Sequence, residues 1–347
     1  MLMTALVKTK AEPGCMEIAQ VEKPVITPDQ VLVNVKYCGI CGTDHSLRGW
    51  NEAIASSYKI KFPAIFGHEF SGVVAEVGSN VSGIEVGERV TVNPIQYCNT
   101  CSYCAVGAVN ICDNRPFQGT DLPGGFAEYI AVRAQNIVKL PDNVSLKAGA
   151  VMEPFCVAIH AIDRAKPELG QSAVVVGPGA IGLMMVAVLK FLGVGPLIVV
   201  GTAADKDRLE FAKSIGADAI INSNETDPVE EVRKLTGGRG ADVVYDAAGH
   251  FTVVPQAMLM AAKRGRIGVI GLPPVPSEVL MTKLAMSEIS IVGSRAYELK
   301  TWYQAAQMIS AGLNVEPFAS HVFPMADFEE AFKLVDEKQG LRILLAP

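Results

Sequence analysis

The stretch AVVVGPGAIG, residues 173–182, decides the fold of one half of this 347-residue chain. Its first four residues are an apolar run typical of a buried strand, and a G-x-G-x-x-G pattern follows and opens an apolar helix. Gly177 allows a tight turn, Gly179 lets the backbone approach a pyrophosphate, and Gly182 lets helix and strand pack closely. The helix N-terminus offers unpaired N–H groups to phosphates. The stretch therefore predicts a dinucleotide-binding unit.

Beyond this stretch, short apolar runs alternate with helical patterns. The runs are 173–176, 197–200, 219–221, 243–245, 266–270 and 289–293, and the helical patterns between them include 206–215, 228–236 and 253–262. Strand–helix alternation predicts crossover units and a doubly wound parallel sheet, so the chain is expected to be an α/β protein. We assign residues 156–289 to this dinucleotide-binding domain.

The first 155 residues have a different pattern. Short strands such as 31–37, 72–77, 89–92 and 127–132 are separated by glycine-rich turns, which predicts a β-rich domain of barrel type. After residue 290 comes one helix, 302–311, and a mixed segment that we expect to return to this first domain. Residues 1–155 and 290–347 are thus predicted to form one domain.

The type of dinucleotide depends on the end of the second strand. An acid about 20 residues after the glycines would bind the ribose 2′-hydroxyl of NAD, but this position, near Thr202 or Ala203, holds no acid. Asp205 comes too late unless the loop folds back, and capping the following helix is its alternative role. Lys206 or Arg208 could pair with a 2′-phosphate, although an ordinary exposed helix charge is the more common role for either residue taken singly. The pattern favours NADP over NAD.

Composition excludes several classes of protein. Half of the residues are apolar, 19% are charged, and the net charge is −6, so neither disorder nor a basic nucleic-acid or membrane surface is expected. Residues 173–189 carry no charge, but three glycines and a proline interrupt them, which favours a buried strand and helix over a membrane span. The first residues lack a signal-peptide layout, and we expect a cytoplasmic protein.

Four cysteines at close spacing form the most specific metal signal. They lie among polar residues within about 94–114, and they are Cys98, Cys101, Cys104 and Cys112. Four thiolates make a closed tetrahedral set that suits a structural Zn²⁺, with no position left for substrate. Four reduced buried cysteines are the alternative, but these would lie on apolar elements. We predict a metal-stabilised lobe.

A second set of metal-binding residue types is dispersed over three segments. Cys41 follows Cys38, His68 precedes Glu69, and Glu153 precedes a proline. The cysteine pair could be a redox C-x-x-C, but no thioredoxin-like unit surrounds it. Singly, these residues have ordinary structural roles. One thiol, one imidazole and one or two carboxylates together suit a catalytic Zn²⁺ with an open position.

These motifs, taken in order, resemble the zinc-dependent medium-chain alcohol dehydrogenases over nearly the whole chain. The resemblance rests on residues 39–44 (GICGTD), 67–69 (GHE), the four-cysteine lobe, 124–129 (GGFAEY), 153–154 (EP) and the glycine pattern. It implies a GroES-like catalytic domain, one catalytic and one structural zinc, and a Rossmann cofactor domain. Glu153-Pro154, where simple alcohol dehydrogenases carry a cysteine ligand, resembles the polyol and threonine dehydrogenase branch.

The resemblance also assigns roles. Cys41, His68 and Glu153 would surround the catalytic zinc, with Glu69 a direct or alternating ligand, and Thr43 would take the proton of the substrate hydroxyl. The hydride would pass to the nicotinamide. The family usually places a histidine five residues after the ligand cysteine, where this chain has Ser46, with His45 one residue earlier. Either His45 turns inward or the relay ends at Ser46 and water. The predicted dinucleotide contacts are Gly177, Pro178, Gly179, Ala180, Ile181, Gly182, Thr202, Ala203, Arg208 and Gly271.

Substrate contacts are less determined. Polyol members often carry Arg-Tyr after the last cofactor-domain strand, and here Tyr297 matches while Arg295 lies one residue before the arginine position. The expected reaction is oxidation of a secondary alcohol of a polyol or sugar derivative. A threonine-type dehydrogenase is the alternative, followed by a non-catalytic dinucleotide-binding relative, which would have no need to retain all the proposed active-site residues. The resemblance implies a homodimer or homotetramer, usually through edge-to-edge pairing of cofactor-domain sheets.

Overall fold

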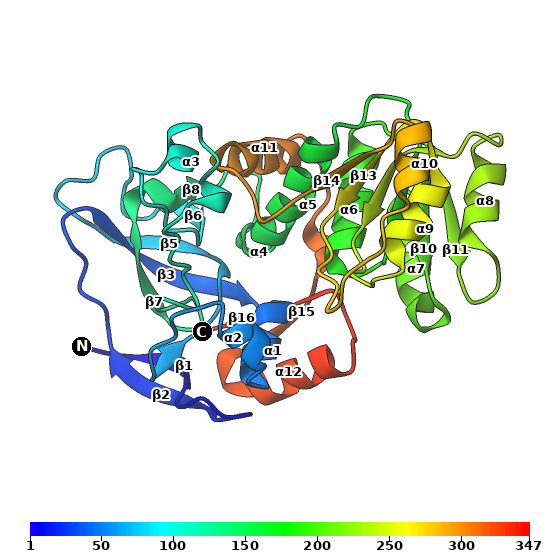
Figure 1. The fold of residues 1–347 in the computed structure, drawn as a ribbon. Helices are drawn as coiled ribbons and strands as arrows, with labels where there is room; N and C mark the ends of the chain where they lie inside the picture. Colours follow the sequence, from blue (N-terminus) through cyan, green and yellow to red (C-terminus); the bar gives the residue numbers. More distant parts are fainter. The chain divides into compact units, whose positions relative to one another are not determined.

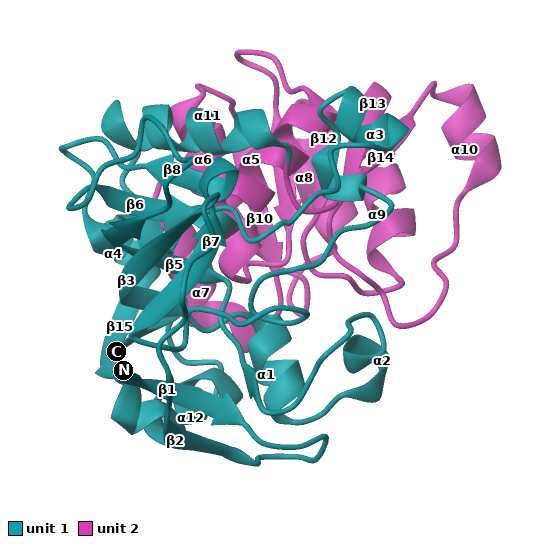
Figure 2. Ribbon diagram, turned by 90° about the vertical axis from the view of Figure 1, so that its left-hand side faces the viewer, with its two compact units in different colours: residues 1–153, 298–347 teal, residues 154–297 magenta.

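The structure is a computed structural model that describes residues 1–347. The chain forms two compact units, one of residues 1–153 and 298–347 and the other of residues 154–297 (Figure 2). Helix α5 (Met152–Ala165) runs from the first unit into the second. No helix is both long enough and apolar enough to span a membrane.

The first unit is built on a seven-stranded, mainly antiparallel sheet (Figure 1). Its order is β15 (Ala319–Pro324), β16 (Arg342–Ala346), β3 (Gln30–Gly39), β5 (Glu69–Val77), β6 (Arg89–Val92) and β8 (Ile137–Lys139), and β7 (Tyr129–Arg133) also pairs with β3. A smaller sheet has the order β2 (Met16–Glu22), β1 (Leu2–Lys8), β4 (Ala64–Ile65). The helices of this unit are α1 (Gly42–Arg48), α2 (Glu52–Ala55), α3 (Ser102–Ala105), α4 (Leu146–Ala150), α11 (Leu299–Ser310) and α12 (Phe328–Asp336).

Strand β3 organises this unit because it has partners on both sides. Its inward residues Val31, Val33 and Val35 are buried in one core with Phe70 and Phe126. Leu32 between them is also fully buried, and less buried positions return at Asn34 and Lys36, so one end of β3 is buried on both faces. The β-rich domain predicted from the sequence is confirmed.

The second unit is a six-stranded parallel sheet. Its order is β11 (Ala219–Asn222), β10 (Leu197–Gly201), β9 (Ala173–Val176), β12 (Ala241–Asp246), β13 (Ala261–Val269) and β14 (Ser290–Gly293). The helices are α6 (Ala180–Phe191), α7 (Lys206–Ser214), α8 (Pro228–Leu235), α9 (Val253–Met260) and α10 (Met281–Met286). Because the chain steps outward from β9 in one direction and then from β12 in the other, right-handed crossovers place α6 and α7 on one face and α8 and α9 on the opposite face. The predicted doubly wound sheet is confirmed.

Candidate active site

The register of β3 against β5 brings two distant motifs together. Gly39 at the end of β3 pairs with Glu69 at the start of β5. Cys41 follows β3 as the N-cap of α1, and His68 directly precedes β5, so their side chains meet at the same end of the two strands. The metal-binding atoms of Cys41, His68 and Glu69 all lie within 4.8 Å of one another.

This cluster is buried and strongly negative. His68 is 3% exposed and Glu69 is fully buried, and Cys41 is half-buried. Burial acts to lower the pKa of His68, but the charges of Asp44 and Cys41 outweigh it and hold the pKa well above its usual value. Both oxygens of Glu69 are buried and neither has a hydrogen bond of regular geometry, although Oε2 forms an ion pair with Arg342 Nε at 2.9 Å. Nitrogen, sulfur and oxygen ligand atoms that converge in a buried, negatively charged site form the environment that a divalent cation such as Zn²⁺ fits.

Asp44 holds two of these ligands in position from behind. It is fully buried on α1, where its Oδ2 accepts a hydrogen bond from the Cys41 N–H at 2.9 Å and its Oδ1 accepts one from the Gly67 N–H at 3.1 Å. His68 Nδ1 is 3.7 Å from Asp44 Oδ1. This distance is longer than a hydrogen bond, so Asp44 acts on the His68 ring through its charge, which raises the pKa of the ring.

Two glycines permit the close approach. Gly67 has φ +91°, and a Cβ there would lie 2.7 Å from Cys38 Sγ and 2.8 Å from the Phe126 ring. A Cβ on Gly39 would lie 2.6 Å from Glu69 Oε2. The flanking glycines of the two motifs are therefore required for packing and for a left-handed backbone conformation at Gly67.

The four lobe cysteines form a second, separate metal-binding group. Cys98 Sγ is 3.9 Å from Cys104 Sγ and 3.5 Å from Cys112 Sγ, and Cys101 Sγ is 3.8 Å from Cys112 Sγ. A tetrahedron with Zn–S bonds of about 2.3 Å has S···S edges of about 3.8 Å, so the sulfurs stand at the spacing that Zn²⁺ needs. Hydrogen bonds from Thr100 lower the pKa of Cys98 to about 6, which favours the thiolate.

The glycine turn of the second unit is shaped for a ligand. Gly177 follows β9 with φ +97°, and a Cβ on Gly182 would lie 2.1 Å from the Gly177 carbonyl oxygen. Gly179 is different, because its φ is −70° and a Cβ there would meet nothing within 4 Å. The protein itself does not require a glycine at 179. Gly179 is also the N-cap of α6 and provides no side-chain cap, which leaves the helix N-terminus open to a phosphate.

The end of β10 shows how the expected ribose position is arranged. Asp205 folds back, and its Oδ2 accepts hydrogen bonds from the Thr202 N–H at 3.0 Å and from the Thr202 hydroxyl at 2.7 Å. The Ala203 N–H donates to Asn224 Oδ1 at 2.8 Å. Asp205 thus closes the turn before α7, where Lys206 is exposed and Arg208 half-buried.

Asp246 supports the same edge from the end of β12. It is fully buried, and its Oδ1 accepts hydrogen bonds from the N–H groups of Ala248 at 3.1 Å and Gly249 at 2.9 Å. The turn that it holds packs against both glycine positions predicted to contact the dinucleotide. A Cβ on Gly177 would lie 2.7 Å from the Ala248 nitrogen, and one on Gly271 would lie 2.2 Å from the Gly249 nitrogen.

Comparisons with known proteins identify the family of this chain. Residues 27–142 match the alcohol dehydrogenase GroES-like domain, and residues 180–311 match the zinc-binding dehydrogenase family. An L-threonine 3-dehydrogenase of Bacillus subtilis (strain 168) is 36% identical over 350 residues, with 99% of each chain covered. The chain belongs to the zinc-dependent medium-chain dehydrogenase family.

Two further comparisons fit this zinc-dependent dehydrogenase family. A sorbitol dehydrogenase of Halalkalibacterium halodurans is 34% identical over 349 residues, 99% of each chain. Among solved structures, an alcohol dehydrogenase from E. coli CFT073 in complex with NADH has a TM-score of 0.91 and 32% identity, and the match covers 100% of this chain and 99% of that one. The relatives thus carry names from both the threonine and the polyol branch.

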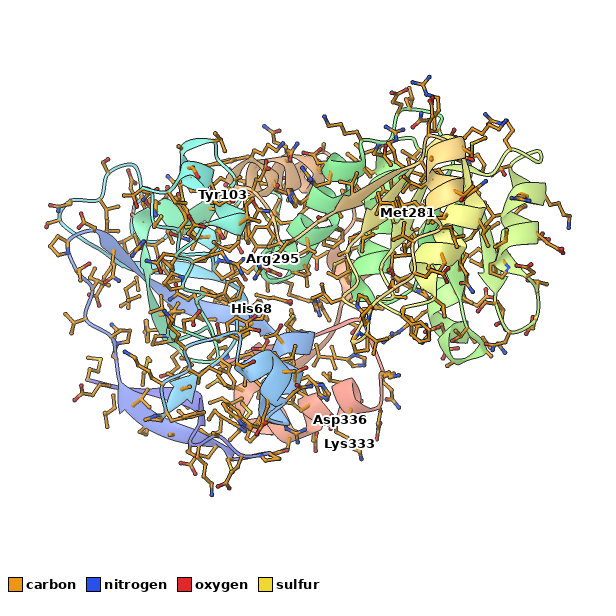
Figure 3. The ribbon with its side chains drawn as sticks, viewed as in Figure 1. His68, Tyr103, Met281, Arg295, Lys333 and Asp336 are labelled. Atoms are coloured by element: carbon orange, nitrogen blue, oxygen red, sulfur yellow. The ribbon has the colours of Figure 1, made fainter.

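Within this dehydrogenase, His45 lies on the exposed side of α1. Its Nε2 is 2.7 Å from Asp336 Oδ1 on α12, and its side chain is 41% exposed. Arg48 joins the same group, with Nη1 3.2 Å from Asp336 Oδ2 and Nη2 2.9 Å from Glu329 Oε2. Figure 3 shows Asp336 on α12 and His68 in the interior of the same unit. The structure therefore gives His45 a carboxylate partner on α12.

The remaining predicted residues have varied surroundings. Glu153 is 6% exposed near the start of α5, and its charge acts on the pKa of His68, but it is outside the group of three close ligands. Arg295 follows β14 and is exposed, and Tyr297 is fully buried. Thr43 is half-buried in the first turn of α1, two residues after Cys41.

Sequence reasoning assigned no role to three residues that the geometry connects to these sites. Asp44 was visible within the GICGTD motif, as the N3 residue of a helix that begins after Cys41. Arg342 pairs with Glu69 from β16, and Asp246 supports the glycine turns. No local pattern marks Arg342, because its partner Glu69 comes from another strand, whereas Asp246 bonds the N–H groups of Ala248 and Gly249 two and three residues later, a local turn signal that sequence reasoning missed.

Proposed function

We propose that this protein is a zinc- and nicotinamide-dependent dehydrogenase that oxidises a secondary alcohol of a polyol or sugar derivative and reduces the matching ketone. The observation that carries the proposal is the buried group of Cys41, His68 and Glu69, with Glu153 nearby. These residues would hold the catalytic metal, and Cys98, Cys101, Cys104 and Cys112 the structural one. The turn 177–182 with Thr202, Ala203, Arg208 and Gly271 would hold the dinucleotide.

The bound groups supply Lewis-acid activation of the substrate oxygen and a hydride acceptor. The chain's own residues bind the substrate, orient the metal ligands and accept the substrate's proton. Asp44 orients Cys41 and His68, and Arg342 balances the charge of Glu69. Thr43 accepts the proton of the substrate hydroxyl.

The path of the proton beyond Thr43 follows from the surroundings of α1. Ser46 lies three residues after Thr43, so both share one face of the helix, whereas His45 pairs with Asp336. We infer that the relay ends at Ser46 and water. Ser46→Ala should lower kcat several-fold, and His45→Gln should leave it within about twofold. If kcat, measured across the pH–rate profile, falls more in His45→Gln than in Ser46→Ala, the relay belongs to His45.

The charges of the first unit support a neutral polyol over an amino alcohol. A substrate ammonium group needs an acceptor when it is desolvated. Both oxygens of Asp44 accept backbone hydrogen bonds, and Glu69 is paired with Arg342. The carboxylates of Asp44 and Glu69 thus already have partners within the protein. A threonine-type activity is the second candidate, favoured by the names of relatives such as the Bacillus subtilis enzyme.

The end of β10 supports NADP as the preferred dinucleotide. The carboxylate of Asp205 is committed to Thr202, and Lys206 is exposed beside it. A 2′-phosphate would pair with Lys206 or Arg208. Lys206→Glu should raise KM for NADP more than KM for NAD, and an equal effect on both would contradict this preference.

The deciding experiment is nicotinamide absorbance during turnover. NAD and NADP are each tested with sorbitol, 2,3-butanediol, threonine and 2-butanol, with and without a chelator. Chelator-sensitive reduction with the polyols supports the proposal, and turnover of threonine alone supports the second candidate. Cys41→Ser should abolish turnover but retain dinucleotide binding, and full activity in this variant would refute the zinc site.

We also propose a homodimer or homotetramer that works in the cytoplasm. Strand β14 is an edge strand hydrogen-bonded only to β13, and nearby α10 exposes Met281 and Met286. Such an edge is a template for pairing with a second copy. None of the eight cysteines forms a disulfide, as expected in a reducing compartment. Light scattering of wild type and of Ile291→Pro tests the pairing.

A further inference from the structure

An aromatic series leads away from the candidate metal ligand His68 in the first unit. The Phe117 ring lies edge-on to the His68 imidazole, with centroids 5.1 Å apart. The Tyr58 ring follows, with its centroid 6.4 Å from that of Phe117. Tyr58 belongs to the segment between Cys41 and His68.

One carboxylate fixes Tyr58 and Phe117 relative to each other. Asp121 Oδ1 accepts a hydrogen bond from the Lys59 N–H at 2.6 Å, next to Tyr58, and its Oδ2 accepts one from the Phe117 N–H at 2.8 Å. The two loops are therefore joined directly at the residues that carry the two rings. A hydroxyl on such a support is held in place before any ligand arrives.

The surroundings keep the Tyr58 hydroxyl neutral. Burial raises its pKa, the charge of His68 acts in the opposite direction, and Cys41 raises it further. The hydroxyl is thus a neutral donor and acceptor at physiological pH. The proposed reaction through Thr43 makes no use of it.

We propose that Tyr58 is a specificity-determining residue, whose hydroxyl bonds a second oxygen of the substrate beside the carbinol that reacts. The inference rests on the proposed function and makes it narrower. The hydrogen bond from Tyr58 would favour vicinal diols and polyols over alcohols with a single hydroxyl. Asp121 is the matching positioning residue, because it holds the segment that carries Tyr58 against the loop that carries Phe117.

The test compares a diol with a mono-alcohol in the zinc-loaded enzyme. Tyr58→Phe should lower kcat/KM for 2,3-butanediol about tenfold, the effect of one lost hydrogen bond, and leave that for 2-butanol within about twofold. Asp121→Ala should raise KM for the diol with little change in kcat. Tyr103→Phe is the matched control, since Tyr103 is exposed on α3 and lies apart from His68 (Figure 3). This variant should leave kcat/KM unchanged for both substrates.

Different results would contradict the role of Tyr58 and the proposed dehydrogenase function. Wild-type protein that oxidises no substrate of the panel contradicts the proposed function itself. A wild type that oxidises 2,3-butanediol, with a Tyr58→Phe variant that keeps the same preference for diol over 2-butanol, overturns only the role of Tyr58. Equal losses for both substrates in Tyr58→Phe would also overturn it, because they indicate a structural role. Zinc content and thermal midpoint of each variant accompany the rates.

Discussion

Arg342 Nε lies 2.9 Å from Glu69 Oε2, and both side chains are buried. The contact arises because β3 is paired on both sides, with Gly39 opposite Leu344 of β16 on one side and opposite Glu69 of β5 on the other. Burial acts to lower the pKa of Arg342, but Glu69 and the neighbouring acidic groups raise it, so the guanidinium stays charged. It offsets a carboxylate that also faces the candidate metal site.

Removal of the Arg342 side chain should therefore lower the stability of the folded protein. Arg342→Met leaves Glu69 buried without its partner and should lower the free energy of unfolding by about 3–5 kcal/mol. Arg264→Met is the control, because Arg264 pairs with Glu288 at 3.3 Å with both side chains mostly exposed, and it should cost less than about 1 kcal/mol. Urea unfolding measures both, and equal losses would contradict the importance of the buried pair.

Gly67 should be irreplaceable for two separate reasons. Gly67→Ala places a Cβ at 2.7 Å from Cys38 Sγ on a backbone with φ +91°. Left-handed strain of about 1–2 kcal/mol adds to an overpacking cost of about 1–3 kcal/mol. Gly83→Ala has a similar φ of +74° but nothing within 4 Å, so it should show the strain alone. If both variants unfold at the same urea concentration, the packing argument is wrong.

Asp246 should make the stability of the second unit depend on pH. Burial raises the pKa of Asp246, so the folded chain retains its proton to a higher pH than the unfolded chain, whose pKa is about 3.9. Its contribution to stability then falls as pH rises from that value through the raised folded pKa. Asp246→Asn keeps the Oδ1 acceptor and has no such dependence. The stability of the variant minus that of wild type should increase with pH across this window in urea titrations, and a constant difference would contradict the shift.

The four-cysteine lobe should lose its metal through a single substitution. Cys104→Ser removes one corner of the tetrahedron, and we expect one metal ion per chain fewer by elemental analysis, together with proteolysis within residues 98–115. Cys15→Ser is the matched control, since Cys15 belongs to neither metal-binding group. Unchanged metal content in the Cys104→Ser variant would contradict the assignment of a structural zinc to this lobe.

Local pattern accounts for most of the fold and for part of the site. The alternation of apolar runs and helices predicted the parallel sheet, and β9, β10 and β11 lie within about a residue of the predicted strands. Cys41 and His68 were predictable because their residue types and flanking glycines form recognisable motifs. The residues that contact the candidate site from other parts of the chain could not be predicted from local patterns. Arg342 meets Glu69 only through the pairing of β16, β3 and β5, and the position of Tyr58 depends on a carboxylate in another loop.

The position of β16 between β15 and β3 has a consequence for biosynthesis. The ribosome must add Arg342 before the interior charge of Glu69 is balanced, although Cys41 and His68 have emerged long before. Residues 154–297 form their own sheet and core, and they are synthesised between the two parts of the first unit. Because domains fold as units while the chain is made, the second unit can fold while the large sheet of the first unit still lacks β15 and β16 and β3 has an unpaired edge.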